Sequence, residues 1–157
     1  SDGHWQQNDY KSFSPSVKSG FIDWSSAPAI QEMPVQSLIC NPPTGSVLSE
    51  DVDEIEVSGY AWSGGGRDVI RVDVCVNDDL WYEAELKKQD DLKPGRAWGW
   101  SLWKVVVPVP EGSSTVKISC RAVDESYNSQ PETPKSIWNV RGLNNNSVHN
   151  ITLTKEQ

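Results

Sequence analysis

The chain has 157 residues, a formal net charge of -8 and 36% hydrophobic residues. This length suits one domain, or one domain plus an arm, with a core that needs neither disulfides nor metal. The acidic balance argues against non-specific binding to nucleic acid or to an anionic membrane surface. No stretch approaches the roughly 18 to 20 apolar residues of a membrane span, so we expect a soluble chain without membrane partners.

Residues 1–36 differ in composition from the rest of the chain. They carry Pro, Ser and Gly at short intervals, and their aromatic residues follow neither a helical nor a strand period: Trp5, Tyr10, Phe13, Phe21 and Trp24. A disordered tail seldom contains so many aromatic residues. We therefore expect an extended arm that packs against another surface, which need not belong to this chain.

From residue 37 onward the pattern predicts strands. Short β-rich runs, several of them alternating apolar with polar residues, are bounded by Gly, Pro, Asn or Asp: 54–62, 69–76, 80–86, 100–109, 114–124 and 149–154. In the run 69–76, the even-numbered Ile70, Val72, Val74 and Val76 share the face expected to be core. The residues 77–79, Asn-Asp-Asp, are expected to form a hairpin turn.

This spacing of strands and turns predicts an all-β fold. No run longer than about ten residues holds apolar residues at helical spacing, so long helices are not expected. Several short strands at turn-separated intervals are typical of an immunoglobulin-like antiparallel β-sandwich. We predict such a sandwich at residues 37–157, preceded by the arm at 1–36.

Two arginines are candidates for binding an anion. Arg141 lies in IWNVRGLNNN (137–146), between an apolar run that contains a tryptophan and an asparagine run. It is either a solvated surface charge or a group held in place for an anion. Arg67 follows three glycines in SGGGR (63–67), which lacks the spacing of a phosphate-binding loop. Such glycines more often serve positive φ angles or close backbone approach.

The tryptophan-rich run 97–105 suggests an interaction surface. A strand would place Trp98 and Trp100 on one face and Trp103 on the other. The run could stack carbohydrate, but we favour core packing together with a patch between subunits or domains, because aromatic residues are enriched at interfaces.

The sequence contains no recognisable metal or catalytic centre. Cys40, Cys75 and Cys120 are widely spaced, and we expect them to be reduced, mostly buried and chemically inert. No His, Cys and carboxylate set has metal-ligand spacing, and no two carboxylates are marked as a general acid and base. Taken alone, the chain does not look like a complete catalyst.

Several blocks of the chain together resemble the C-terminal part of eukaryotic sulfite oxidases, in order from His4 to about Leu153: HWQQNDYKSFSPSV, SAPAIQEMPVQS, GYAWSGGGRDVIRVDV, RAWGWSLWKVVVPVPEG, CRAVDESYNSQPE and IWNVRG. The resemblance implies that residues 1–36 close a molybdenum-molybdopterin domain and that 37–157 form an immunoglobulin-like domain that makes the homodimer. Such an enzyme turns sulfite and water into sulfate, with two electrons passing through molybdenum. The cofactor would be bound by the preceding domain and not by this chain, and a haem domain upstream is left open.

The resemblance also implies roles for both arginines. Arg141 falls on the family's arginine in the motif Trp-Asn-apolar-Arg-Gly, which reaches the sulfite pocket beside the molybdenum. Arg67 matches the family pattern as well, with a role at the boundary to the cofactor domain. The chain departs from the family at residues 77–80, where hairpin glycines are missing, and at 148–150, where Trp-His-Arg becomes Val-His-Asn.

Two other functions are weighed against this one. The first is a stand-alone, non-catalytic interaction module derived from such an enzyme, with the tryptophan-rich face as its contact surface. The weaker second one is a fragment of a related nitrate reductase, which usually carries methionine where this chain has Arg141. The family implies the mitochondrial intermembrane space for animal-like members and the peroxisome for plant-like members.

Overall fold

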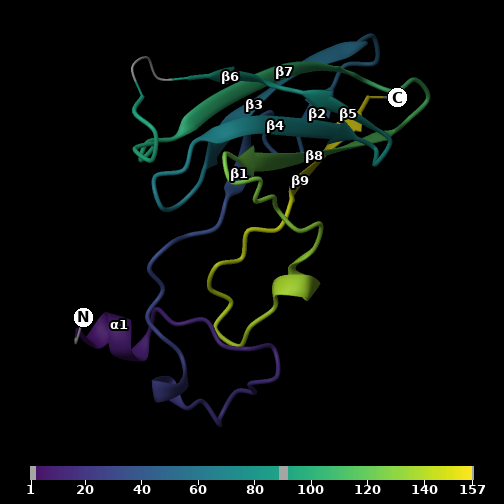
Figure 1. The fold of residues 1–157 in the computed structure, drawn as a ribbon. Helices are drawn as coiled ribbons and strands as arrows, with labels where there is room; N and C mark the ends of the chain where they lie inside the picture. Colours follow the sequence, from purple (N-terminus) through teal and green to yellow (C-terminus); the bar gives the residue numbers. More distant parts are fainter. Residues whose placement is uncertain (1–2, 89–91, 157) are drawn as a thin grey trace.

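The computed structural model describes residues 3–88 and 92–156. The elements of this part of the chain, shown in Figure 1, are α1 (His4–Asn8), η1 (Trp24–Ser26), β1 (Gln36–Asn41), β2 (Val47–Leu48), β3 (Glu54–Trp62), β4 (Val69–Val76), β5 (Leu80–Glu83), β6 (Glu85–Lys87), β7 (Ser101–Pro108), β8 (Thr115–Asp124), η2 (Pro134–Ile137) and β9 (His149–Lys155).

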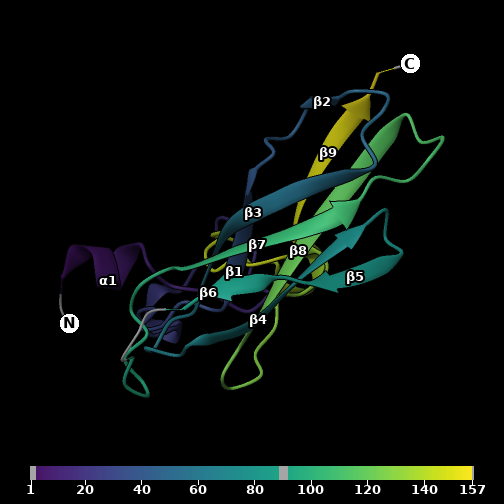
Figure 2. The same ribbon diagram turned by 90° about the horizontal axis from the view of Figure 1, so that it is seen from above.

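The strands form two sheets that pack face to face. Their orders are β1-β3-β7-β6 and β2-β9-β8-β4-β5, and the pairs are antiparallel except for the short parallel pair β2-β9. Figure 2 shows β3 and β7 of one sheet running obliquely to β8 and β9 of the other. The predicted all-β sandwich is thus confirmed, while its immunoglobulin-like assignment stays a prediction. No helix among the described residues is long and apolar enough to cross a membrane.

The core lies between the two sheets and consists mainly of β-branched side chains. They come from alternate positions of the longer strands, as the period-2 pattern requires. Fully buried members include Val57, Val72, Val74, Val107, Val116, Ile118 and Leu153.

The prediction that Ile70 belongs to the core is wrong. Its side chain is 37% exposed, whereas Val69 is buried. The pairing with β8 shifts between Val69 and Arg71, so that two residues of β4 face one residue of its partner. Such a β-bulge exchanges the faces of the residues before it, and the alternation therefore holds only from Val72 onward.

The predicted single run 80–86 is divided between the two sheets. β5 pairs with β4, whereas β6 pairs with β7 in the opposite sheet. Ala84 lies at the crossing point, where it is buried and donates its N–H to the carbonyl of Val72 at 2.8 Å. Alternation within a short run does not show which sheet each half joins, so this division could not be predicted.

The hairpin turn predicted at 77–79 is confirmed. Asn77 and Asp78 have φ angles of 51° and 58°, values that Asn and Asp adopt more readily than most side chains. The Asn77 side chain accepts the backbone N–H of Lys117 at 2.8 Å, and the Lys117 ammonium contacts Asp78 at 2.8 Å. These contacts stabilise a turn that contains no glycine.

The arm is largely irregular, as expected, although α1 adds one short helix without buried residues. Figure 1 shows the arm beside the segment 125–148 that joins β8 to β9. Part of its packing partner therefore belongs to this chain. Phe13 is buried, whereas Phe21 is 89% exposed, so other arm aromatics remain at the surface.

His149 connects the two sheets. Its Nδ1 accepts the backbone N–H of Ile39 in β1 at 3.2 Å, and burial lowers its pKa below the ordinary 6.5. A protonated imidazole cannot accept this hydrogen bond. Because the folded protein binds the proton less readily, the contribution to stability is complete above pH 6.5 and is lost as pH falls through the folded-state pKa.

We predict that the melting temperature of His149→Gln depends less on pH than that of the wild type between about pH 7 and 5, because this window spans the ordinary histidine pKa. Thermal unfolding followed by circular dichroism measures this dependence. The matched control is His4→Gln, since His4 is exposed, and it should retain the wild-type slope. Equal slopes in all three proteins would show that His149 does not titrate with unfolding.

Candidate functional site

The loop that carries Arg141 is held by hydrogen bonds from Asn139. The Asn139 side chain accepts the backbone N–H of Arg141 at 3.1 Å and donates to the carbonyl of Leu143 at 2.8 Å. The Asn139 carbonyl accepts the N–H of Gly142 at 3.0 Å, and Gly142 has a φ of 67°. Glycine adopts this φ without steric cost. The short sequence Asn-Val-Arg-Gly thus builds a turn with Arg141 near its end.

The Arg141 side chain points to the arm. Its Nη2 donates to the Asp9 carboxylate at 2.9 Å, and its guanidinium lies 5.3 Å from the centre of the Trp24 ring. The side chain is 33% exposed. Among the described residues Asp9 is its one carboxylate partner. A guanidinium has several N–H donors in a planar fork, so donors remain for a small oxyanion.

Arg67 is engaged more completely than Arg141. Its Nε donates to Asp124 at 3.0 Å and its Nη1 donates to Glu32 of the arm at 2.7 Å. The hydrogen bond with Glu32, together with the one to Asp124, raises the pKa of Arg67. The two negative charges of Asp124 and Glu32 exceed the single positive charge of Arg67. Arg67 therefore joins the arm to the sandwich and offers little to an added anion.

Asp124 is the buried centre of this connection. Its carboxylate, at 0% exposure, accepts hydrogen bonds from the Ser63 hydroxyl at 2.8 Å and from the Asn128 side chain at 2.9 Å. Burial alone would raise the pKa of Asp124, but the hydrogen bonds from Asn128, Ser63 and the Ser126 amide hold it below the ordinary value. The charged carboxylate therefore fixes the end of β8 against the loop 63–67.

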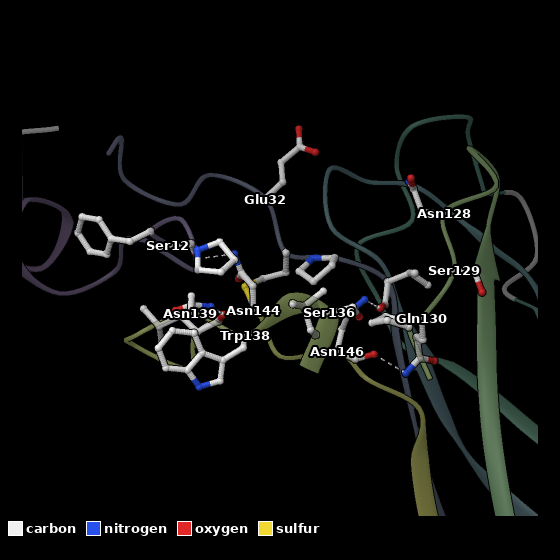
Figure 3. A pocket seen from close by; sticks show the side chains of 18 of the residues that line it. Ser12, Glu32, Asn128, Ser129, Gln130, Ser136, Trp138, Asn139, Asn144 and Asn146 are labelled. Atoms are coloured by element: carbon white, nitrogen blue, oxygen red, sulfur yellow. Dashed lines mark hydrogen bonds between the residues drawn. The ribbon is translucent and has the colours of Figure 1, made fainter. Parts of the chain in front are cut away.

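A cavity of about 780 Å³ lies between the arm and the end of the sandwich. Figure 3 shows Ser12, Trp138, Asn139 and Asn144 at one end and Gln130 and Asn146 at the other. The Asn144 side chain donates to the Ser12 hydroxyl at 3.2 Å, whereas its buried Oδ1 has no partner. Arg67 also lines this cavity, but it is already paired with Glu32 and Asp124, and Arg141 lies outside the residues that line it.

As predicted, the glycines before Arg67 allow a positive φ angle and a close approach of the backbone. Gly66 has a φ of 74°, and a Cβ at Gly64 would collide with the backbone of Met33 in the arm. The loop 63–67 therefore lets the arm approach closely. Its glycines are accounted for without a phosphate ligand.

The three tryptophans of the run 97–105 lie in different environments. β7 begins at Ser101, so Trp98 and Trp100 lie in the preceding loop and not in a strand as expected. Both are about 60% exposed, and the Trp100 ring lies 4.1 Å from that of Tyr60. Trp103 is 2% exposed and belongs to the core. The interface role assigned to these residues stays a prediction, for which Trp98 and Trp100 offer accessible surface.

The cysteines do not form a metal site. Cys75 and Cys120 are buried, and burial raises the pKa of the Cys120 thiol to about 12, whereas Cys40 is exposed. In residues 3–88 and 92–156, no group of three or more His, Cys, Asp and Glu side chains could hold a metal ion.

The acids that surround the two arginines could not be predicted from the sequence. Asp9, Glu32 and Asp124 lie in unrelated parts of the chain, and Asp9 is 132 residues from Arg141. No spacing rule links such positions. Only the position of Asp124 at the end of a predicted strand could have marked it as an anchor for the loop that follows.

Comparisons with known proteins agree on the family. The model of the Mo-co oxidoreductase dimerisation domain matches residues 27–156. The chain is 47% identical to the mitochondrial sulfite oxidase of Homo sapiens over 94% of its own length and 27% of that protein. It is 48% identical to the mitochondrial sulfite oxidase of Drosophila melanogaster, over 96% of the chain and 27% of that protein.

A solved structure is similar in fold. The sulfane dehydrogenase SoxCD of Paracoccus pantotrophus matches with a TM-score of 0.65 and 23% identity, over 93% of this chain and 35% of that one. The chain therefore spans about a quarter of the curated relatives and about a third of this structure.

We predict that Asp124→Ala lowers the free energy of unfolding by about 3 kcal/mol, because it leaves Arg67 and the hydrogen-bond donors of Ser63, Ser126 and Asn128 without their carboxylate. Urea denaturation of the chain measures the loss. The matched control is Asp79→Ala, which removes an exposed acid from a turn and should change stability by less than about 0.5 kcal/mol. Similar losses in both variants would contradict the anchoring role of Asp124.

Proposed function

The chain belongs to the Mo-co oxidoreductase dimerisation domain family, and from this premise we propose that it is the C-terminal dimerisation part of a molybdenum-dependent sulfite oxidase. The similarity to two proteins named sulfite oxidase supports this, since it extends over nearly the whole chain. The proposed reaction converts sulfite and water into sulfate and requires the larger part of the enzyme, of which the chain spans about a quarter.

We further propose that Arg141 contributes to the sulfite pocket. The supporting observation is that Asp9 is its single carboxylate partner among the described residues, which leaves guanidinium donors at a partly exposed position. Each charge-assisted hydrogen bond to the anion contributes on the order of 1.5 to 3 kcal/mol. The guanidinium also stays charged at any relevant pH. Arg67 is assigned the boundary between the arm and the sandwich, because two carboxylates already occupy it.

Asp9 and Trp24 position the Arg141 guanidinium in this proposal. Both belong to the arm, which would close the cofactor domain. The ion pair to Asp9 and the aromatic ring of Trp24 restrict the side chain from two directions. Sulfite would then share the guanidinium with Asp9, so the arm and the Arg141 loop act together on the anion.

The cofactor is assigned to the rest of the enzyme. Molybdenum-molybdopterin would supply the two-electron oxidation, and in this proposal it is held by the part of the enzyme that the chain does not span. A haem domain and the electron acceptor are left open. We place the enzyme in the mitochondrion, as the names of the relatives suggest, with the intermembrane space as the finer assignment.

The other functions have less support. A stand-alone interaction module would not require the Arg141 turn or its ion pair with the arm. A nitrate reductase is disfavoured by Arg141 itself, because the related nitrate reductases usually carry methionine at this position of the motif.

Arg141→Met tests the anion role in a hybrid enzyme in which this chain replaces the matching C-terminal part of the Drosophila melanogaster relative. We expect kcat/KM for sulfite to fall about 10- to 100-fold, mainly through KM, because one or two charge-assisted hydrogen bonds are lost. Steady-state kinetics measure the change. Arg96→Met removes an exposed arginine elsewhere as the matched control and should leave KM unchanged. An unaltered KM in Arg141→Met would remove Arg141 from the pocket.

The isolated chain should show no sulfite oxidation, because it spans about a quarter of the enzyme it resembles and the proposal assigns the cofactor to the rest. The same assay, with added sulfite and an artificial electron acceptor, measures turnover by the purified chain and by the hybrid enzyme. Activity in the hybrid alone is the expected result, whereas turnover by the chain would contradict the division of labour.

A further inference from the structure

The segment 131–148, which carries Arg141, closes on itself at its base. The N–H of Val148 donates to the carbonyl of Pro131 at 2.9 Å. A surface loop whose two ends lie this close has the form of an Ω-loop, and such loops frequently carry functional side chains. The position of Arg141 therefore depends on how this base is attached to the sandwich.

Gln130 attaches the base of the segment to both sheets. Its Oε1 accepts the Ser37 hydroxyl of β1 at 2.7 Å and the backbone N–H of Ala122 in β8 at 2.9 Å. Its Nε2 donates to the carbonyl of Asn146 at 2.9 Å (Figure 3) and to that of Ser147 at 3.3 Å. The residue is only 5% exposed. A side-chain amide offers two N–H donors and an oxygen with two lone pairs, so all four positions are used within the chain.

Asn146 joins the same base to the start of β1. It is buried, and its side chain donates to the carbonyl of Val35, the residue before β1, at 2.8 Å. Nearer the tip of the segment, the Asn144 side chain donates to the Ser12 hydroxyl of the arm at 3.2 Å. These amides of the cavity wall therefore hold the segment in place, since their hydrogen bonds are directed at the backbone and at the arm.

The contact between Arg141 and the arm depends on two separate attachments to the sandwich. The arm, which supplies the Asp9 partner of Arg141, is joined to the sandwich through Arg67. The segment that carries Arg141 is joined to it through Gln130. A shift of the base of the segment therefore moves the guanidinium relative to Asp9, while the arm stays in place. Misplacing a binding group by ~1 Å can cost about 100-fold in rate.

We propose that Gln130 is a positioning residue for Arg141 and thereby sets the affinity of the proposed sulfite pocket for its oxyanion, in an inference that rests on the anion role proposed above. Gln130 does not touch the anion. It holds the segment 131–148 to both sheets, so that the Arg141 guanidinium stays beside the arm. A loosened base gives the guanidinium more positions, and the anion then binds only the fraction of molecules in which the guanidinium is correctly placed.

Gln130→Glu tests the attachment in the purified chain. It keeps the length of the side chain and an oxygen that accepts from both sheets, but it places a second oxygen against the two carbonyls to which the amide donates. Hydrogen exchange of the Val148 N–H, measured by NMR, should become about ten times faster than in the wild type, because the base opens more often. Gln31→Glu makes the same replacement in an exposed side chain of the arm and should leave this rate unchanged. If Gln130→Glu does not fold, Gln130→Met, which is neutral and similar in length, takes its place. An unchanged exchange rate in the folded variant would overturn the attachment.

Steady-state kinetics of the hybrid enzyme test the effect on the anion. Gln130→Glu should raise KM for sulfite about tenfold, and in the Arg141→Met background the same change should raise it by less than about twofold, because it acts through Arg141. An equal increase in both backgrounds, or no increase in either while Arg141→Met raises KM, would overturn the positioning role and leave the proposed function standing. A KM that Arg141→Met leaves unaltered would overturn the proposed anion role and this inference with it.

Discussion

The buried carboxylate of Asp124 is the constraint on which the arrangement of the arm, the Arg67 loop and the sandwich depends. It stays charged because hydrogen bonds outweigh the cost of burial, and it holds Arg67, whose other end binds Glu32 of the arm. Removing one member of such a network leaves its partners without their hydrogen bonds, so the members stabilise the connection together. The arm is thereby fixed near the loop that carries Arg141.

The two arginines differ in what they can still bind. Both form ion pairs with arm carboxylates, but Arg67 meets two of them and Arg141 meets one. The number of paired carboxylates therefore distinguishes Arg67, a structural cation, from Arg141, which can bind a small oxyanion. Their sequence contexts did not distinguish them. The acidic chain would repel sulfite over most of its surface. Arg141, in contrast, is a cation that lies next to the arm, where a cofactor domain would continue.

Much of the fold could be predicted because alternation in residues such as Val72, Val74 and Val76 reflects a half-buried sheet directly. The prediction failed at Ile70, where a bulge shifts the register, and in the run 80–86, where the chain changes sheets at Ala84. Both depend on pairing partners far along the chain. The same limit applied to the site. Arg141 could be singled out by its motif, but its partner Asp9 could not, because no local sequence pattern links residues 132 positions apart.

A structure of the hybrid enzyme with sulfate bound beside its cofactor would test the central claim most directly, because it measures the distance from the Arg141 guanidinium to the anion. The account predicts at least one N–H···O hydrogen bond of about 2.7–2.9 Å from Arg141 to a sulfate oxygen. A sulfate held by other residues, with Arg141 paired to Asp9 alone, would contradict it.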